Sequence, residues 1–269
     1  MLDPTLISPP DTQVVQVDEL TVRITNSTAE LTQDASALAI EYLQSLLTQQ
    51  ETASIILATG NSQLQFLDAI ARNKDLDWSR IIVFHLDEYL GIKADHSGSF
   101  RYYLHHKVEK RVKPRIFHYI NGDAAEPLQE CDRYSKLLQQ QAIDLCLLGI
   151  GDNGHLAFNE PNLANFKDKE VVKLIKLETK TRQQQVNGGY FPHLEAVPNY
   201  AYTLTIPTIC AANKIFCLAG GKHKAEITKK TLENAIAPNF PATILRQQPQ
   251  ATLFCTGKNP IELARYYQN

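Results

Sequence analysis

The chain has 269 residues, of which 43% are hydrophobic and 21% are charged, and its formal net charge at pH 7 is -2. This is the composition of a globular protein that is long enough to bury a sizeable core in one α/β unit. The near-neutral charge and the absence of a basic stripe or a long apolar run argue against nucleic acid or a membrane as a partner.

The N-terminal segment and the cysteines give two further expectations. Residues 1–17 contain three Pro, and we predict a leader on the surface there, followed by a single domain over residues 18–269. The leader lacks the basic start and the apolar stretch of a secretory signal. The five Cys stand singly without metal-ligand spacing, so we expect free thiols, a cytoplasmic location and no metal site.

Apolar, β-rich runs alternate along the chain with segments of helical periodicity. We predict strands at 21–25, 54–58, 80–86, 143–150, 171–177, 201–206, 215–218 and 252–255. We predict helices at 27–49, 63–72, 100–112, 129–141, 223–234 and 260–267. This order predicts an α/β, three-layer Rossmann-like fold, with a mostly parallel sheet and helices on both faces. Ligands of such folds bind beyond the carboxyl ends of the strands.

The loop after the predicted strand 54–58 has the form of an anion-binding turn. It contains Thr59, Gly60, Asn61, Ser62 and Gln63 and leads directly into a helix. Free N–H groups and the dipole at a helix start favour an anion, and the two hydroxyls add donors. The loop is not a Walker motif, and on its shape alone an ordinary helix cap remains the favoured interpretation.

An acidic pair follows the predicted strand 80–86. Asp87 and Glu88 stand at the end of this buried strand, where a carboxylate suits a general base that moves a carbon-bound proton. Only one of the two needs to face a site. The alternative is an acidic turn that caps a helix.

The third loop carries a glycine pattern with two interpretations. Residues 149–154 match GxGxxG directly after a strand, which is the fingerprint of a dinucleotide site. Pro161 follows Gly154 by only seven residues and would interrupt the long helix that this fingerprint requires, so NAD binding is the minor alternative. The other interpretation is an acid–base site built from Asn153, His155 and Glu160, in which His155 moves protons near neutral pH.

Taken together, the loops resemble a known family. GIGDNGHLAFNEP (149–161) resembles the signature of the glucosamine-6-phosphate deaminases, VFHLDEYLGI (83–92) their proton-transfer loop, and LATGNSQ (57–63) their phosphate loop. The similarity runs in unbroken order from about residue 20 to residue 254. The related 6-phosphogluconolactonases share the GxGxxGH core but not the NEP sequence that follows it.

The resemblance implies a role for each matching position. Asp87 would move the proton between C2 and C1 of the open-chain sugar phosphate, His155 would open the sugar ring, and Glu160 would orient His155. Thr59 to Gln63 and Lys224 would hold the phosphate. The reaction would convert glucosamine 6-phosphate to fructose 6-phosphate and ammonia without a cofactor, and the partner would be a small sugar phosphate; a homo-oligomer is left open.

The chain departs from the family pattern at two places. Many members have Asp where this chain has Asn153, and better-known members carry an Arg beside the aromatic pair that is here Tyr190 and Phe191. We expect Arg182, upstream, to replace that Arg. Three alternatives stay open: a 6-phosphogluconolactonase, another sugar-phosphate isomerase, and a non-catalytic sugar-phosphate-binding module.

Overall fold

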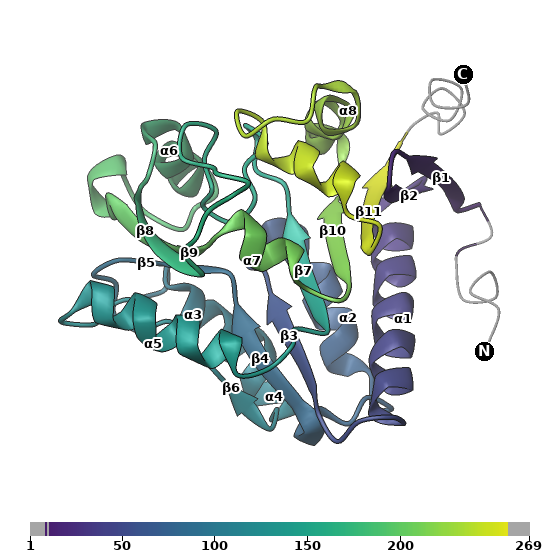
Figure 1. The fold of residues 1–269 in the computed structure, drawn as a ribbon, viewed down its shortest axis with the longest axis horizontal. Helices are drawn as coiled ribbons and strands as arrows, with labels where there is room; N and C mark the ends of the chain where they lie inside the picture. Colours follow the sequence, from purple (N-terminus) through teal and green to yellow (C-terminus); the bar gives the residue numbers. More distant parts are fainter. Residues whose placement is uncertain (1–8, 10, 258–269) are drawn as a thin grey trace.

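The computed structural model describes residue 9 and residues 11–257. Its main sheet has eight strands in the order β1-β2-β11-β10-β7-β3-β4-β6, all parallel except β1, which runs antiparallel to β2 at the edge (Figure 1). The strands are β1 Gln13–Val17, β2 Leu20–Thr25, β3 Ala53–Leu57, β4 Ile81–His85, β6 Ile116–Phe117, β7 Leu145–Gly149, β10 Ile215–Ala219 and β11 Ala251–Thr256.

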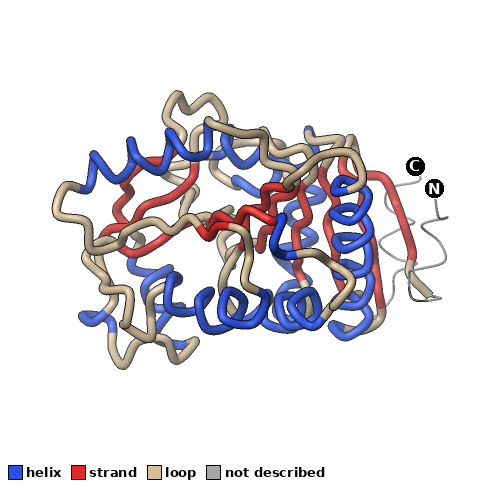
Figure 2. The backbone as a smooth tube through the Cα atoms, turned by 90° about the horizontal axis from the view of Figure 1, so that it is seen from below, coloured by secondary structure: helices blue, strands red, loops and turns tan. Residues whose placement is uncertain are grey.

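Helices cover both faces of the main sheet (Figure 2). They are α1 Thr28–Leu47, α2 Leu64–Arg72, α3 Phe100–Leu104, α4 Lys110–Val112, α5 Pro127–Gln139, α7 Ile206–Cys210 and α8 Ala225–Glu233. Helix α6 Thr179–Asn187 lies instead beside the smaller sheet described next (Figure 1). Successive residues of a strand point to opposite faces, so Ile55 of β3 packs into the core under α1 and α2, while Ile56 packs into the core under α5, α7 and α8. The structure thus confirms the predicted α/β fold with a mostly parallel sheet.

A second sheet lies beside the carboxyl ends of the main strands. It contains β5 Asp87–Tyr89, β9 Tyr200–Leu204 and β8 Val172–Lys176, paired antiparallel in that order. The strands predicted at 171–177 and 201–206 therefore exist but belong to this smaller sheet. β5 was not predicted, because three residues are too few to show a period.

Two further predictions need adjustment, and one helix was not predicted. Residues 13–17 of the predicted leader form β1, whose valines pair with β2 at the sheet edge. The helix predicted over 100–112 is divided by one π-helical turn at His105–Glu109. Helix α6 was not predicted, because its sequence is polar on every side. The helix predicted at 260–267 lies outside the described residues.

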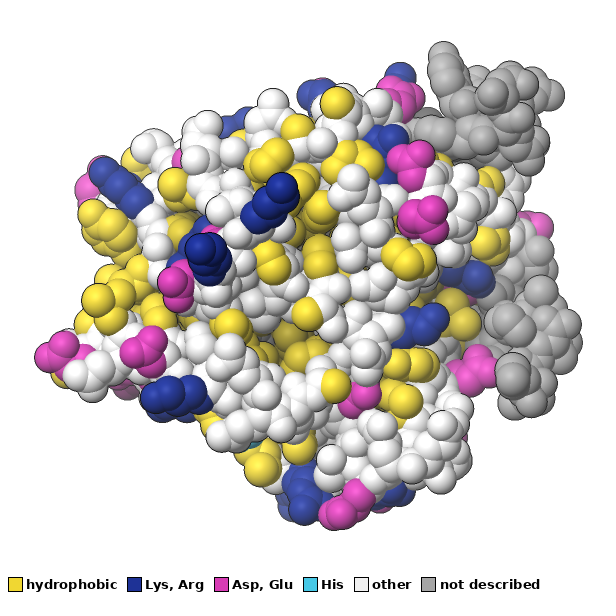
Figure 3. All heavy atoms as spheres, in the orientation of Figure 1, with side chains coloured by type: hydrophobic (Ala, Val, Ile, Leu, Met, Phe, Trp, Pro, Cys, Tyr) yellow, Lys and Arg dark blue, Asp and Glu magenta, His cyan; other side chains and the backbone are white. Residues whose placement is uncertain are grey.

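The composition-based expectations can be compared with the described part of the chain. All five cysteines are free thiols there. No helix among the described residues is both long enough and apolar enough to span a membrane. The face in Figure 3 carries Lys and Arg side chains interspersed with Asp and Glu, rather than a field of one sign. An anionic ligand must therefore be held by local groups.

Candidate active site

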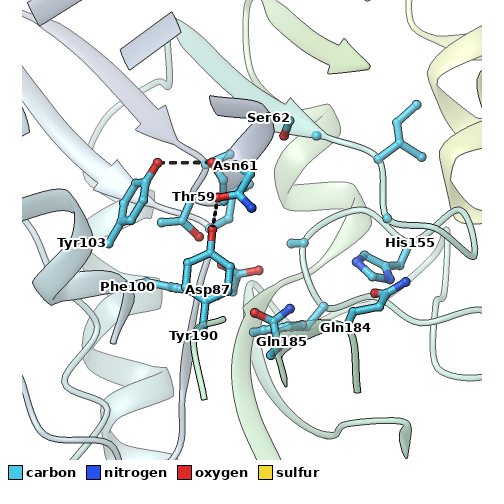
Figure 4. Close-up of a pocket in the computed structure, with 18 of the residues that line it drawn as sticks. Thr59, Asn61, Ser62, Asp87, Phe100, Tyr103, His155, Gln184, Gln185 and Tyr190 are labelled. Atoms are coloured by element: carbon cyan, nitrogen blue, oxygen red, sulfur yellow. Dashed lines mark hydrogen bonds between the residues drawn. The ribbon is translucent and has the colours of Figure 1, made fainter. Parts of the chain in front are cut away.

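A cavity of about 300 Å³ opens at the carboxyl ends of the neighbouring strands β10, β7, β3 and β4 (Figure 4). This is the position that the fold class predicts for a ligand. All three loops singled out from the sequence reach it. Its lining includes Thr59, Gly60, Asn61, Ser62, Asp87, Ser97, Tyr103, Gly151, Asp152, His155, Gln184, Gln185, Tyr190, His223 and Lys224.

The two members of the acidic pair have different surroundings. Asp87 lines the cavity, although only 7% of its surface is exposed. Burial, with a contribution from the neighbouring charge of Glu88, raises the pKa of Asp87 well above its ordinary value. A carboxylate with a raised pKa is a stronger base than an ordinary carboxylate, which suits the removal of a carbon-bound proton.

Glu88 points away from the cavity and caps helix α3. Its carboxylate accepts hydrogen bonds from the Ser99 hydroxyl at 2.8 Å and from the backbone N–H groups of Tyr89, Phe100 and Arg101 at 2.9 to 3.1 Å. The Glu88 carboxylate thus satisfies N–H groups at the start of the helix that have no partner within it. The helix-cap interpretation of the acidic pair is therefore correct for Glu88 alone.

Asn153 connects His155 to the buried Glu160. The Asn153 amide donates through Nδ2 to Glu160 Oε2 at 2.7 Å, so its Oδ1 must accept. That Oδ1 lies 2.7 Å from Nδ1 of His155, which therefore carries the ring proton and leaves the lone pair on Nε2. Glu160 itself is 3.6 Å from Nδ1, so it orients His155 mainly through Asn153 rather than directly.

Electrostatics keep Glu160 ionised behind this pair. Burial alone would raise the pKa of Glu160, but the neighbouring His155 and the hydrogen bond from Asn153 outweigh it and lower the pKa. The charged oxygen is thus a strong acceptor that fixes the direction of the Asn153 amide.

The glycine pattern serves the imidazole rather than a nucleotide. A Cβ on Gly151 would lie 2.1 Å from Nε2 of His155, so only Gly leaves room for the ring. The dinucleotide fingerprint also requires a helix directly after its third glycine. The chain instead turns after Gly154, and the next α-helix, α6, begins at Thr179.

The residues of the first loop have two different places: most line the cavity, and one is buried beneath it. Thr59 to Ser62 line the cavity, and Gly60 has φ of 101°, a conformation that favours Gly. Gln63, by contrast, is fully buried and donates through Nε2 to the carbonyl of Leu148 at 3.1 Å. The structure thus does not bring the Gln63 side chain to the cavity: its amide ties this loop to strand β7.

The two predicted cations also have different places. Lys224 lines the cavity, where its Nζ donates to Ile150 O at 2.8 Å and to an oxygen of Asp152 at 2.7 Å. Arg182 does not line it. Its guanidinium donates instead to the carbonyls of Leu194 and Val197 at 2.6 to 3.2 Å, so the structure does not bring this predicted substrate contact to the cavity.

Sequence reasoning missed the cavity residues contributed by α6 and by the residues after it. Gln184, Gln185 and Tyr190 line the cavity, and the Tyr190 hydroxyl donates to Asn61 Oδ1 at 2.6 Å (Figure 4). From α3, Tyr103 donates to the carbonyl of Gly60 at 3.2 Å. A mostly polar helix has no apolar period to reveal it.

Comparisons with known proteins agree with this arrangement. Residues 26–254 match the family described as glucosamine-6-phosphate isomerases/6-phosphogluconolactonase. The chain belongs to this family. Relatives in it include glucosamine-6-phosphate deaminases of Lysinibacillus sphaericus, 36% identical over 73% of this chain and 86% of that protein, and of Thermoanaerobacter pseudethanolicus, 33% identical over 82% and 88%.

Solved structures show the same fold. A monomeric glucosamine-6-phosphate deaminase aligns with a TM-score of 0.81 and 31% identity, covering 89% of this chain and 98% of its own. A 6-phosphogluconolactonase from Shewanella baltica aligns with a TM-score of 0.74 over 90% of this chain and 100% of its own. At 17% identity, this second likeness concerns the fold alone.

Proposed function

We propose that the protein is a glucosamine-6-phosphate deaminase, which converts glucosamine 6-phosphate and water to fructose 6-phosphate and ammonia. One observation carries this proposal. A buried carboxylate with a raised pKa, Asp87, and an imidazole of fixed tautomer, His155, line the same cavity. A base for a carbon-bound proton and a second group for a sugar hydroxyl are what aldose–ketose chemistry needs.

In the first step, His155 opens the sugar ring. Its unprotonated Nε2 takes the proton of the anomeric hydroxyl, and the proton passes to the ring oxygen as the bond between that oxygen and C1 breaks. The Asn153 amide and Glu160 stabilise this step by holding the Nδ1 proton in place.

In the second step, Asp87 moves a proton from C2 to C1. Its carboxylate removes the C2 proton, the electron pair forms the C1–C2 double bond, and the C1 oxygen takes a proton from water, which gives an enolamine. Asp87 then protonates C1, the double-bond electrons form the new C1–H bond, and the nitrogen lone pair leaves a C2 iminium. Water adds to C2 and ammonia leaves, which gives the ketose. The burial that raises the pKa of Asp87 brings the carboxylate closer in basicity to the carbon acid.

The phosphate is placed between two strand-end loops. Thr59, Gly60 and Ser62 supply hydroxyl and backbone groups from the loop after β3, and Lys224 supplies a cation from the segment after β10. β3 and β10 flank β7 in the sheet, so the two loops face each other across the loop that carries His155. We expect the reaction to take place in the cytoplasm.

The test is a product assay with purified protein. Glucosamine 6-phosphate should give equal amounts of ammonia and fructose 6-phosphate, and in D₂O the ketose should carry deuterium at C1. Asp87→Asn should lower kcat by at least about 100-fold, because general-base catalysis contributes roughly that much. Asp168→Asn, the same chemical change in a Lys–Asp pair that does not line the cavity, should keep the parental rate.

Two further substrates distinguish the alternatives. Galactosamine 6-phosphate tests the preference for the sugar, and 6-phosphogluconolactone tests the hydrolase alternative. Rapid lactone hydrolysis without any ammonia release would refute the proposed deaminase activity, and so would an Asp87→Asn variant with the parental rate.

A further inference from the structure

An acidic side chain occupies the end of the cavity that we assign to phosphate. Asp152 follows Gly151 in the loop after β7 and lines the cavity together with Lys224. Burial alone would raise its pKa, but the hydrogen bond and charge of Lys224 outweigh it and lower the pKa, so Asp152 is ionised at neutral pH. A carboxylate beside the cation of an anion site needs an explanation, because it repels the ligand.

Asp152 holds two elements that reach the cavity. One oxygen, Oδ1, accepts from Lys224 Nζ at 2.7 Å, and the other, Oδ2, accepts from Nε2 of Gln184 in α6 at 2.7 Å. Lys224 also donates to the carbonyl of Ile150 at 2.8 Å. An ammonium has three N–H donors, so two are used inside the protein and one remains for a ligand.

Asp152 thus both positions the Lys224 ammonium and neutralises its charge. Its side chain is only 12% exposed, whereas that of Asp152 is 52% exposed. The third N–H can bind a phosphate oxygen without breaking either internal hydrogen bond. The net charge of the pair is zero, however, so a free phosphate dianion gains little Coulomb attraction on entering.

We propose that Asp152 sets the affinity of the phosphate site: as the built-in counter-ion of Lys224, it weakens the binding of a free phosphate ion there. This inference rests on the proposed function only in placing the phosphate at Lys224. A sugar phosphate adds contacts from its hydroxyls to the rest of the cavity, whereas inorganic phosphate has only the ion site. The carboxylate thus weakens the binding of both, and the sugar phosphate still binds through the hydroxyl contacts that inorganic phosphate lacks.

Asp152→Asn separates charge from position. An amide at 152 can still accept from Lys224, and the Gln184 amide can turn to meet it, so the geometry is kept while the negative charge is removed. We expect inorganic phosphate to bind the variant about three-fold more tightly, since exposed charge pairs have effects of this order. The gain should shrink as salt is added.

The measurement is the Kd of inorganic phosphate by calorimetry at about pH 8, where phosphate is a dianion, and its competitive inhibition constant against glucosamine 6-phosphate. Asp168→Asn is the matched control: Asp168 also pairs with a lysine at 2.7 Å, but away from the cavity, and its variant should bind phosphate like the parent. In a Lys224→Ala background, Asp152→Asn should give a clearly smaller gain.

Kinetics add a second readout. With Asp152→Asn we expect a lower KM for glucosamine 6-phosphate and a kcat within about two-fold of the parent, because the charge acts on binding and not on the reacting carbons. A loss of structure would instead lower kcat as well.

The outcomes separate this inference from the proposed function. If inorganic phosphate binds the Asp152→Asn variant no more tightly than the parent, or binds neither, the proposal for Asp152 is wrong. If phosphate binds as expected but no ammonia is formed from glucosamine 6-phosphate, the proposed deaminase activity fails and the role of Asp152 at the anion site stands.

Discussion

A methyl group on Gly151 should displace the imidazole on which ring opening depends. The Cβ of an Ala at this position would lie 2.1 Å from His155 Nε2, whereas ordinary contacts begin near 3.4 Å, so the ring must retreat by more than 1 Å or turn away from Asn153. The backbone at 151 does not have a positive φ, so the Ala itself is tolerated. A misplacement of this size costs about 100-fold in rate, or about 2.7 kcal/mol in the activation barrier.

The assay is kcat for ammonia release from glucosamine 6-phosphate, with thermal unfolding to check the fold. Gly220→Ala is the control, since its Cβ would meet the side chains of Leu31 and Thr28, at 3.2 to 3.7 Å, and not the imidazole. In a His155→Ala background, Gly151→Ala should cause little additional loss, because both changes remove the same group. A Gly151→Ala enzyme with the parental kcat, or equal losses in both backgrounds, would refute the reasoning.

Three further changes test other parts of the site. Burial raises the pKa of Asp87 in the folded state above its value in the unfolded chain, so ionised Asp87 destabilises the folded protein at high pH. Asp87→Asn should therefore raise Tm at pH 8. This gain in Tm should disappear as the pH falls towards about 4, where the carboxyl group is protonated in both states. Glu160→Gln allows the Asn153 amide to reverse, which would put the wrong tautomer on His155, and steady-state kinetics should show kcat lower by about 100-fold. Arg182→Ala should lower the free energy of unfolding in urea by roughly 1 to 3 kcal/mol, because it leaves buried carbonyls unpaired, yet raise KM less than Lys224→Ala does.

The main sheet could be predicted because its strands are buried on both faces. Runs such as residues 54–58 and 143–150 are short, apolar and bounded by turn residues, which is the pattern of a parallel strand. Their carboxyl ends then locate the loops that carry Asp87 and His155. Burial and order along the chain were enough for this step, and no long-range contact had to be known.

Two predicted ligand contacts do not reach the cavity, and both belong to residues whose hydrogen-bond partners are distant in sequence. Nothing local distinguishes the guanidinium of Arg182, which satisfies carbonyls 12 to 15 residues away, from one that faces a ligand. The same holds for Gln63, whose partner Leu148 is 85 residues away. Such hydrogen bonds are set by tertiary packing, so a polar side chain in a candidate loop can be a support as easily as a contact.

The small sheet explains how two distant loops keep one geometry. Thr203 of β9 pairs with Asp87 of β5, and its hydroxyl accepts from the backbone N–H of Phe158 at 3.1 Å. One residue further, the carbonyl of Leu204 accepts from the Asn159 amide at 2.8 Å.

Strand β9 is therefore bonded both to Asp87 and to the loop that ends in Glu160. The distance between Asp87 and His155 is set by backbone and buried amides rather than by exposed side chains, which is the kind of rigid support that a two-base reaction requires. This also gives the NEP sequence a physical role: its Asn fastens the His155 loop to the sheet that carries Asp87.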